Sequence, residues 1–136
     1  MSEASLAAQR LAVVTMRARS ALTSIVPALN IFDRNERPES FPCVIIGEAQ
    51  VVGDEADCLI SSEVYLTLHL WTKETGFVAC KSIAGEVRRA LYQLAGTQDG
   101  FRLSFNFDDA KYLRDPSGEL SHGVVTFMVR AREVTP

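Results

Sequence analysis

A strict alternation of side-chain types over residues 63–72 is the feature that most constrains how this chain can fold. Successive side chains of an extended strand point to opposite faces of a sheet. One face of this strand would therefore be wholly aliphatic, and the other would carry large, partly polar side chains. The aliphatic set is Val64, Leu66, Leu68 and Leu70, and the opposite set is Tyr65, Thr67, His69 and Trp71. This pattern is typical of a sheet with one covered face.

Three further segments carry strand patterns. Residues 43–53 are rich in β-branched side chains and end at a glycine, whereas residues 101–107 and 123–133 alternate between apolar and polar positions. Between the last two segments, the sequence Asp-Pro-Ser-Gly at residues 115–118 fits a type I turn. Short connections of this kind join antiparallel strands, so we expect hairpins.

Two segments have the three- and four-residue spacing of amphipathic helices. The first spans residues 5–25, and Pro27 is expected to end it because proline cannot donate the next backbone hydrogen bond. Its predicted apolar face consists of Leu11, Val14, Ala18, Leu22 and Ile25. The second helix is predicted over residues 77–95, with Gly96 as its C-terminal cap. Residues 33–42 are polar and contain two prolines, so we expect an exposed loop there.

The predicted order of elements is helix, strand, strand, helix, strand, strand. This order favours an α+β fold: a two-layer sandwich with a mostly antiparallel four-stranded sheet and both helices packed on one face. A chain of 136 residues is long enough to bury one core, so we predict a single domain over residues 1–136.

Composition excludes several classes of protein. The net charge of −3 argues against a dedicated nucleic-acid binder, and no apolar run approaches the roughly 20 residues of a membrane span. The N-terminus lacks the pattern of a signal peptide, which favours the cytoplasm as the site of synthesis and assembly. Cys43, Cys58 and Cys80 are odd in number and widely spaced, so we expect reduced thiols and no zinc site.

No motif for catalysis or for cofactor binding is present. The chain has neither a GxSxG nucleophile turn nor a glycine-rich phosphate loop. The two histidines, His69 and His122, lie at strand positions where histidine is usually structural. The sequence therefore predicts a protein that is not an enzyme and that uses no cofactor and no metal.

An acidic segment follows the first predicted strand. Asp54, Glu55 and Asp57 lack the ligand spacing of a calcium-binding loop, so a solvated loop is the simplest interpretation. The alternative is an acidic surface that pairs with a basic partner or lines a channel.

The polar face of the 63–72 strand is the strongest candidate for an interaction surface. Tyr65, His69 and Trp71 would lie opposite the face that meets the helices, and Met128 and Val124 would extend the patch. Tyrosine and tryptophan are favoured where a surface becomes buried on association. Two alternatives remain at this point: the face is simply amphipathic, or the segment 26–42 covers it.

Four sequence blocks together resemble a known family. They are Phe-Pro-Cys-Val-Ile-Ile-Gly-Glu at 41–48, Leu-His-Leu-Trp-Thr at 68–72, Ile-Ala-Gly-Glu-Val-Arg-Arg-Ala-Leu at 83–91, and Ala-Lys-Tyr-Leu-Arg-Asp-Pro at 110–116 followed by His-Gly-Val at 122–124. In order and spacing the chain resembles the tail completion family of long-tailed phages, prophages and gene transfer agents, over essentially its whole length.

The resemblance implies a fold similar to the lambda-type tail terminator and a structural role. Such proteins assemble as a hexameric ring on the end of the tail tube, stop its growth and present a surface for the head connector. The implied partners are further copies of the chain, the major tube protein and the connector, with DNA only as passing cargo. The implied location is the tail of the particle.

Two rival interpretations remain. One is a neighbouring connector or a minor tail subunit of similar size. The other, from a different class, is a small non-catalytic ligand-binding α+β domain.

Overall fold

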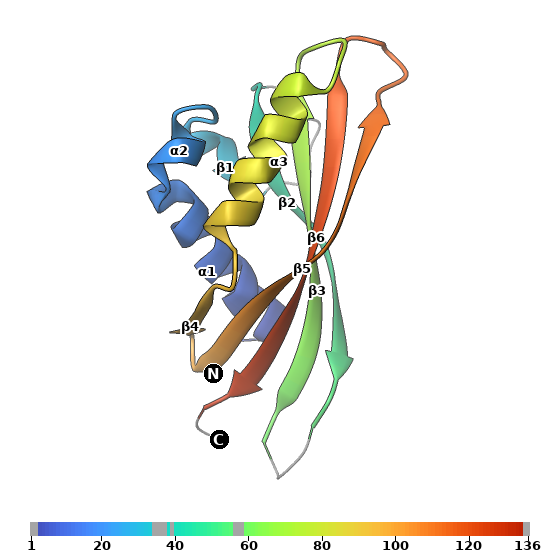
Figure 1. Cartoon of the computed structure of the whole chain (residues 1–136). Coiled ribbons are helices and arrows are strands. Elements are labelled where there is room, and N and C mark those ends of the chain that lie inside the picture. The colour runs from blue at the N-terminus through green and yellow to red at the C-terminus, as the bar shows by residue number, and fades with distance from the viewer. Residues whose placement is uncertain (1–2, 34–37, 39, 56–58, 135–136) are drawn as a thin grey trace.

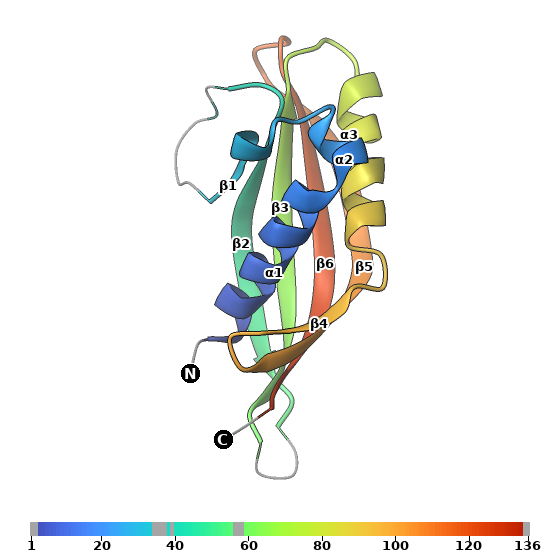
Figure 2. The same ribbon diagram turned by 90° about the vertical axis from the view of Figure 1, so that its left-hand side faces the viewer.

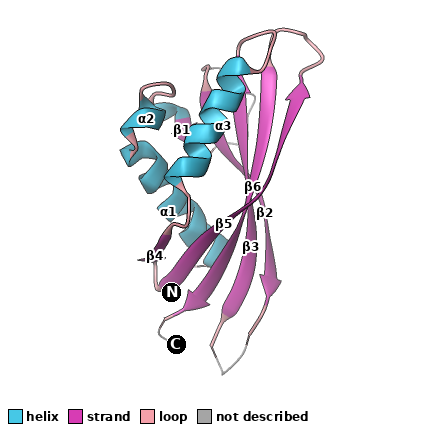
Figure 3. Cartoon of the chain, in the orientation of Figure 1, coloured by secondary structure: helices cyan, strands magenta, loops and turns pink. Residues whose placement is uncertain are grey.

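The computed structural model describes residues 3–33, 38, 40–55 and 59–134. Helices and strands form two layers, with every described helix on the same side of the sheet (Figures 1 and 3). The helices are α1 (Ala4–Ala18), α2 (Ser20–Thr23), a 3-10 turn (Ala28–Asn30) and α3 (Val78–Ala90). No helix in the described part is long and apolar enough to cross a bilayer.

The sheet has six strands and is mixed, so the prediction of a mostly antiparallel four-stranded sheet is wrong. In order across the sheet the strands are β1 (Ile31–Phe32), β2 (Cys43–Gly53), β3 (Ser61–Thr72), β6 (Ser121–Glu133), β5 (Phe101–Arg114) and β4 (Ala95–Gln98). Strand β1 pairs with β2 in parallel, and every other pairing is antiparallel. The broader assignment to α+β holds.

The two strands that the sequence pattern missed are both short and lie at the sheet edges. Strand β1 has two residues, too few to show alternation, and β4 reads Ala-Gly-Thr-Gln, with little β propensity. The second helix was predicted too long because Leu91 and Leu94 continue its apolar spacing. The chain instead turns at Gln93, whose φ is 48°, and Gly96 lies in β4.

The first helix also differs from its prediction, in both its length and its face. It ends at Ala18, because Arg19 adopts an extended conformation, and α2 follows as a separate turn. Val14 is 63% exposed, so it lies off the buried face. The buried residues are Ala4, Ala7, Ala8, Ala12 and Met16. Small side chains let this helix lie close against the sheet, which it crosses obliquely (Figure 2).

The core lies between the helices and the sheet, as the alternation predicts. Val64, Leu66, Leu68 and Leu70 of β3 are all fully buried. Leu103 and Phe105 of β5 and Val125, Phe127 and Val129 of β6 join them, together with Ile83, Val87 and Cys80 of α3.

Two β-bulges preserve this division between faces. Each adds one residue to one strand of a pair: β2 is interrupted between Ile46 and Ala49, and β5 between Phe107 and Asp109. An extra residue in a bulge lets the chain on both sides keep its apolar positions toward the core.

Candidate subunit interface

The second face of the sheet is the face of β3 and its neighbours that points away from the helices. Tyr65, His69 and Trp71 all lie on it and are partly exposed, so their predicted placement on one face is confirmed. Their cross-strand neighbours on β6 are Met128, Val124 and His122 in that order. No described helix covers this side of the sheet (Figure 1).

His69 is held by hydrogen bonds on both ring nitrogens. Its Nε2 lies 2.6 Å from Oε1 of Glu48, and its Nδ1 lies 2.7 Å from Nε2 of His122. With neutral rings, His69 donates from Nε2 to the carboxylate, and His122 donates from Nε2 to His69 Nδ1. These three residues come from β3, β2 and β6, so the chain of hydrogen bonds ties three adjacent strands together.

Gly47, in the bulge of β2, leaves the space that the His69 ring occupies. A Cβ atom added to Gly47 would overlap the ring, with His69 Nε2 only 2.7 Å away and the carbonyl oxygen of Thr67 at 3.1 Å. Glycine is therefore required here for close approach. The extra residue in the bulge, between Ile46 and Ala49, brings the Glu48 carboxylate to the same ring.

Trp71 stacks on His122 at the end of the second face where β3 ends and β6 begins. The two ring centroids lie 3.9 Å apart with an angle of 7° between the planes. Cys43, the neighbour of Trp71 on β2, is fully buried, and burial raises the pKa of its thiol to about 11. Such a thiol is inert at neutral pH. Cys80 is likewise buried and free, as predicted, whereas Cys58 lies outside the described residues.

The cluster also alters the protonation of its members. Burial, and then the neighbouring His69, lower the pKa of His122, although Asp115 and Glu48 oppose this in part. The hydrogen bond from His69 lowers the pKa of Glu48. At neutral pH His122 is therefore uncharged and Glu48 is ionised.

The arrangement resembles part of a catalytic triad but lacks an attacking group. A carboxylate orients His69, yet the group on the other ring nitrogen is a second imidazole and not a hydroxyl or thiol. Among residues 3–33, 38, 40–55 and 59–134, no group of three His, Cys, Asp or Glu side chains is placed to hold a metal ion. The geometry supports a structural role. We call this hydrogen-bonded chain of Glu48, His69 and His122 the clasp.

Two described residues of the segment before β2, Pro38 and Phe41, lie beside one end of the second face. Pro38 and Phe41 line a hollow of about 350 Å³ together with Trp71, Lys73 and the turn residues Asp115, Ser117, Glu119 and Leu120. Half of the predicted 33–42 loop, residues 34–37 and 39, lies outside the described residues.

The acidic residues lie far from Trp71. Asp54 and Glu55 are exposed just beyond β2, where the Asp54 N–H donates to the carbonyl oxygen of Ser61 at 2.9 Å. Trp71 is nine residues along β3 from the Ser62 end, about 30 Å at a strand's rise per residue. Trp71 and the acidic residues therefore lie at opposite ends of β3, whereas Tyr65, three residues from Ser62, lies between them. Asp57, the third acidic candidate, lies outside the described residues.

Sequence reasoning missed the partners of His69. Glu48 and Gly47 have no feature in the sequence that sets them apart, and only the pairing of β3 with both β2 and β6 brings them and His122 to His69. One signal was available: His122 is the second of only two histidines and begins a predicted strand.

Comparison with known proteins agrees with this architecture. The family model described as Tail completion protein gp17 matches residues 13–132. The fold is similar to a chain of the virion of a native gene transfer agent particle, with a TM-score of 0.86 and 20% identity over 97% of this chain and 99% of that one. It is also similar to the bacteriophage SPP1 gp17 protein, with a TM-score of 0.62 and 21% identity over 93% and 89% of the two chains. No curated protein sequence matches. Because the family match spans most of its length, the chain belongs to the family of tail completion proteins, whose role in the phage tail is structural.

Proposed function

We propose that this chain closes the end of a phage-type tail tube as a ring of identical subunits, six according to the family resemblance. The observation that carries the proposal is the second face: a long, curved strand surface with partly exposed Tyr65, His69 and Trp71 and no described helix over it. The likeness in fold to a chain of the gene transfer agent virion supports a place in such a particle.

The mechanism is steric. Cyclic closure uses two different patches on each subunit, so each copy contacts its two neighbours through different surfaces. One side of the ring matches the tube end and the other does not, so addition of tube protein stops once the ring docks. The second side is then free to meet a head connector, while DNA passes through the lumen. No covalent chemistry, cofactor or metal is needed for any of these steps.

The clasp gives the second face a defined shape before assembly. Both nitrogens of His69 are engaged and His122 is stacked, so these rings do not need to be ordered when a partner arrives. Preorganisation of this kind lowers the entropic cost of association.

The test is a Trp71→Glu variant, mixed with preassembled tail tubes and viewed by negative-stain microscopy. We expect wild-type rings on tube ends and at least a tenfold drop in capped ends for the variant, because a charge would be buried at the contact. Loss of the stack should cost about 0.5–1.5 kcal/mol beyond the apolar contact that is lost, so circular dichroism checks that the variant is folded. The control is Leu29→Glu, at a side chain that is 83% exposed on the helical side.

Three outcomes separate the alternatives. If a folded Trp71→Glu protein caps tubes normally, the second face is not part of the contact. A wild-type chain that stays monomeric with tubes present would refute the ring itself. Binding to the head connector but not to tubes would instead indicate a connector subunit.

A further inference from the structure

A row of positively charged side chains follows α3 and the adjoining end of β5. We call it the basic groove, and its charged members are Lys81, Arg88 and Arg89 of α3 with Arg114 of β5, all exposed. It lies on the helical side of the molecule, away from the second face.

Aromatic rings hold these cations in place. The Arg88 guanidinium lies 3.8 Å from the ring centroid of Phe107, and the Lys81 ammonium lies 5.3 Å from that of Tyr112. The Arg114 guanidinium likewise lies 4.6 Å from the ring centroid of Phe77. A cation over an aromatic face keeps its full charge, unlike one that is neutralised by a carboxylate.

The positively charged side chains line a depression in the surface of the molecule. Two hollows of about 150 Å³ and 370 Å³ adjoin along α3, and both are lined by Gly85 and Arg88. A Cβ atom on Gly85 would lie 3.1 Å from the Arg89 guanidinium, so the glycine leaves room for that side chain. Tyr92 lies just beyond the C-terminus of α3, lines the larger hollow and is 68% exposed, so it adds apolar surface to the groove.

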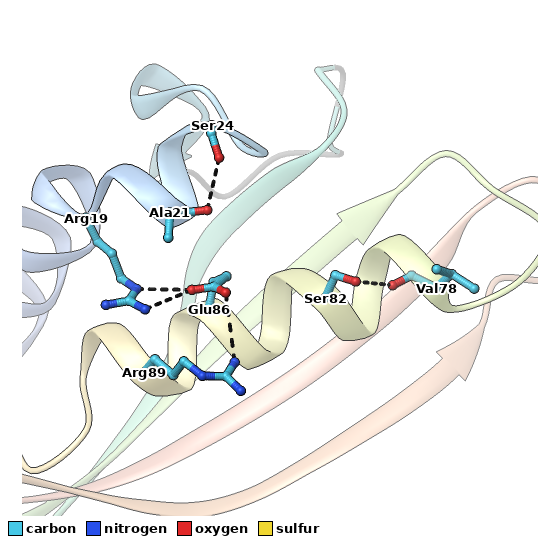
Figure 4. Close-up of polar contacts among 7 residues, drawn as sticks. All are labelled: Arg19, Ala21, Ser24, Val78, Ser82, Glu86 and Arg89. Atoms are coloured by element: carbon cyan, nitrogen blue, oxygen red, sulfur yellow. Dashed lines mark hydrogen bonds and ion pairs between the residues drawn. The ribbon is translucent and has the colours of Figure 1, made fainter.

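Three of the four charged members of the groove have no ion-pair partner among the described residues. Glu86, the only acid of α3, already accepts from Arg19 at 2.9 Å and lies 3.9 Å from Arg89 (Figure 4). Among the described residues, no carboxylate forms an ion pair with Lys81, Arg88 or Arg114. The groove is therefore ready to accept an acidic partner.

A surface of opposite charge lies on the β2–β3 hairpin. We call it the acidic arm: Asp54 and Glu55, flanked by the exposed apolar side chains Val51, Val52 and Ile60 at 44%, 42% and 50%. The arm extends past the helical layer at the end of the sheet opposite the N-terminus of α3 (Figures 1 and 2). It cannot reach the groove of its own chain.

We infer that the basic groove receives the acidic arm of a neighbouring copy of this chain. Each surface combines charge of one sign with exposed apolar side chains, so the two are complementary in both respects. They lie on different parts of the same chain, which is what a head-to-tail ring contact requires. The inference rests on the proposed ring and adds the pair of surfaces that joins its subunits.

Charge reversal tests this contact. We expect the arm variant Asp54→Lys/Glu55→Lys and the groove variant Lys81→Glu/Arg88→Glu each to lower the fraction of capped tube ends at least tenfold. The chain that carries all four substitutions should recover most of the capping, because both partners of the contact have changed sign. Arg10→Glu makes an equal charge change per residue at an exposed site of α1, outside both surfaces and the second face, and should have little effect.

A second measurement separates this inference from the proposed function. A carbodiimide joins a carboxylate to an amine in direct contact, so concentrated wild-type protein should give an intermolecular link between the arm and Lys81, identified by mass spectrometry. If this cross-link forms but the wild-type protein caps no tubes, the contact between arm and groove is supported and the proposed role at the tube end is refuted. Capping by both folded reversed variants at the wild-type level, with no link, would overturn the contact and leave the role intact.

Two further results would overturn the inference. The first is a four-substitution chain that folds but caps no better than the single-surface variants. The second is a groove variant that loses binding to duplex DNA while its capping is unchanged, because the groove would then be a phosphate-binding surface.

Discussion

The two faces of β3 are built on different physical principles. On the core face, four aliphatic side chains from Val64 to Leu70 have no exposed surface at all. On the second face, Tyr65 and His69 are partly exposed, and hydrogen bonds and ring stacking join His69, His122 and Trp71. Burial of apolar area stabilises the first face, and specific polar geometry orders the second.

This contrast shows where the chain can change. A substitution on the core face removes packing that nothing else supplies, so it acts on the whole fold. A substitution on the second face disturbs contacts that lie beside solvent, so it acts mainly on what the surface can bind. Under the proposed function, folding and assembly depend on alternate residues of one strand.

The largest expected effect is on the core face. Leu68→Ala should lower the free energy of unfolding by about 2–5 kcal/mol, because it leaves a cavity in a fully buried site. The matched change on the second face, Tyr65→Ala, should cost less than about 1 kcal/mol, since Tyr65 is partly exposed and donates only to Glu63 at 3.0 Å. Urea unfolding of both variants measures the difference. Equal losses would mean that the two faces are not distinct.

A smaller effect is expected where the second face depends on the backbone. Gly47→Ala should cost about 1–3 kcal/mol, because its Cβ atom must displace the His69 ring and break the clasp. Gly53→Ala in the same strand is the control, since the nearest atoms to its Cβ lie 3.8 Å away on the Glu55 side chain. The chemical shifts of the His69 ring should move only in the first variant. If they stay in place, the ring does not rest against Gly47.

The smallest effect is on pH dependence. Because burial lowers the pKa of His122 below its usual 6.5, the unfolded chain binds a proton there that the folded chain does not. Stability should therefore fall as the pH drops from about 7 through the lowered pKa, and then level off for this group. Glu48, whose pKa is also lowered, acts in the same direction but at pH below its usual 4.5.

His122→Gln provides the check on that assignment. Urea unfolding at pH 7.5 and 5.5 should show a smaller difference for the variant than for wild type. A wild-type protein that is more stable at pH 5.5 would mean that the folded cluster gains a proton, contrary to the geometry.

Sequence alone predicted the parts of the fold that depend on strong periodicity. The alternation in β3, β5 and β6 located the core, and the separation of Tyr65, His69 and Trp71 from it is confirmed. Strands β1 and β4 could not be predicted, because two and four residues are too few for a pattern and are held in place by their neighbours. The face of α1 was missed because alanine contributes little to an apolar pattern yet packs closely.

The candidate site was predictable only in part, for a related reason. Alternation places residues on a face but does not say which strands are neighbours, and the clasp depends on β3 lying between β2 and β6. The contribution of Gly47 depends on a bulge, which has no signature in residue type beyond the glycine itself. That Tyr65, His69, Trp71, Asp54 and Glu55 contact a partner remains a prediction.

The two bulges also bear on how chain length can vary among related proteins. Removing one residue from the interior of a regular strand moves every later side chain of that strand to the opposite face of the sheet. Its apolar side chains would then point to solvent. Removing Glu48 or Asp108 would instead restore a regular ladder, with the flanking residues still opposite their present partners. These two positions are therefore where a single-residue deletion should spare the fold, and at Glu48 the loss would fall on the clasp alone.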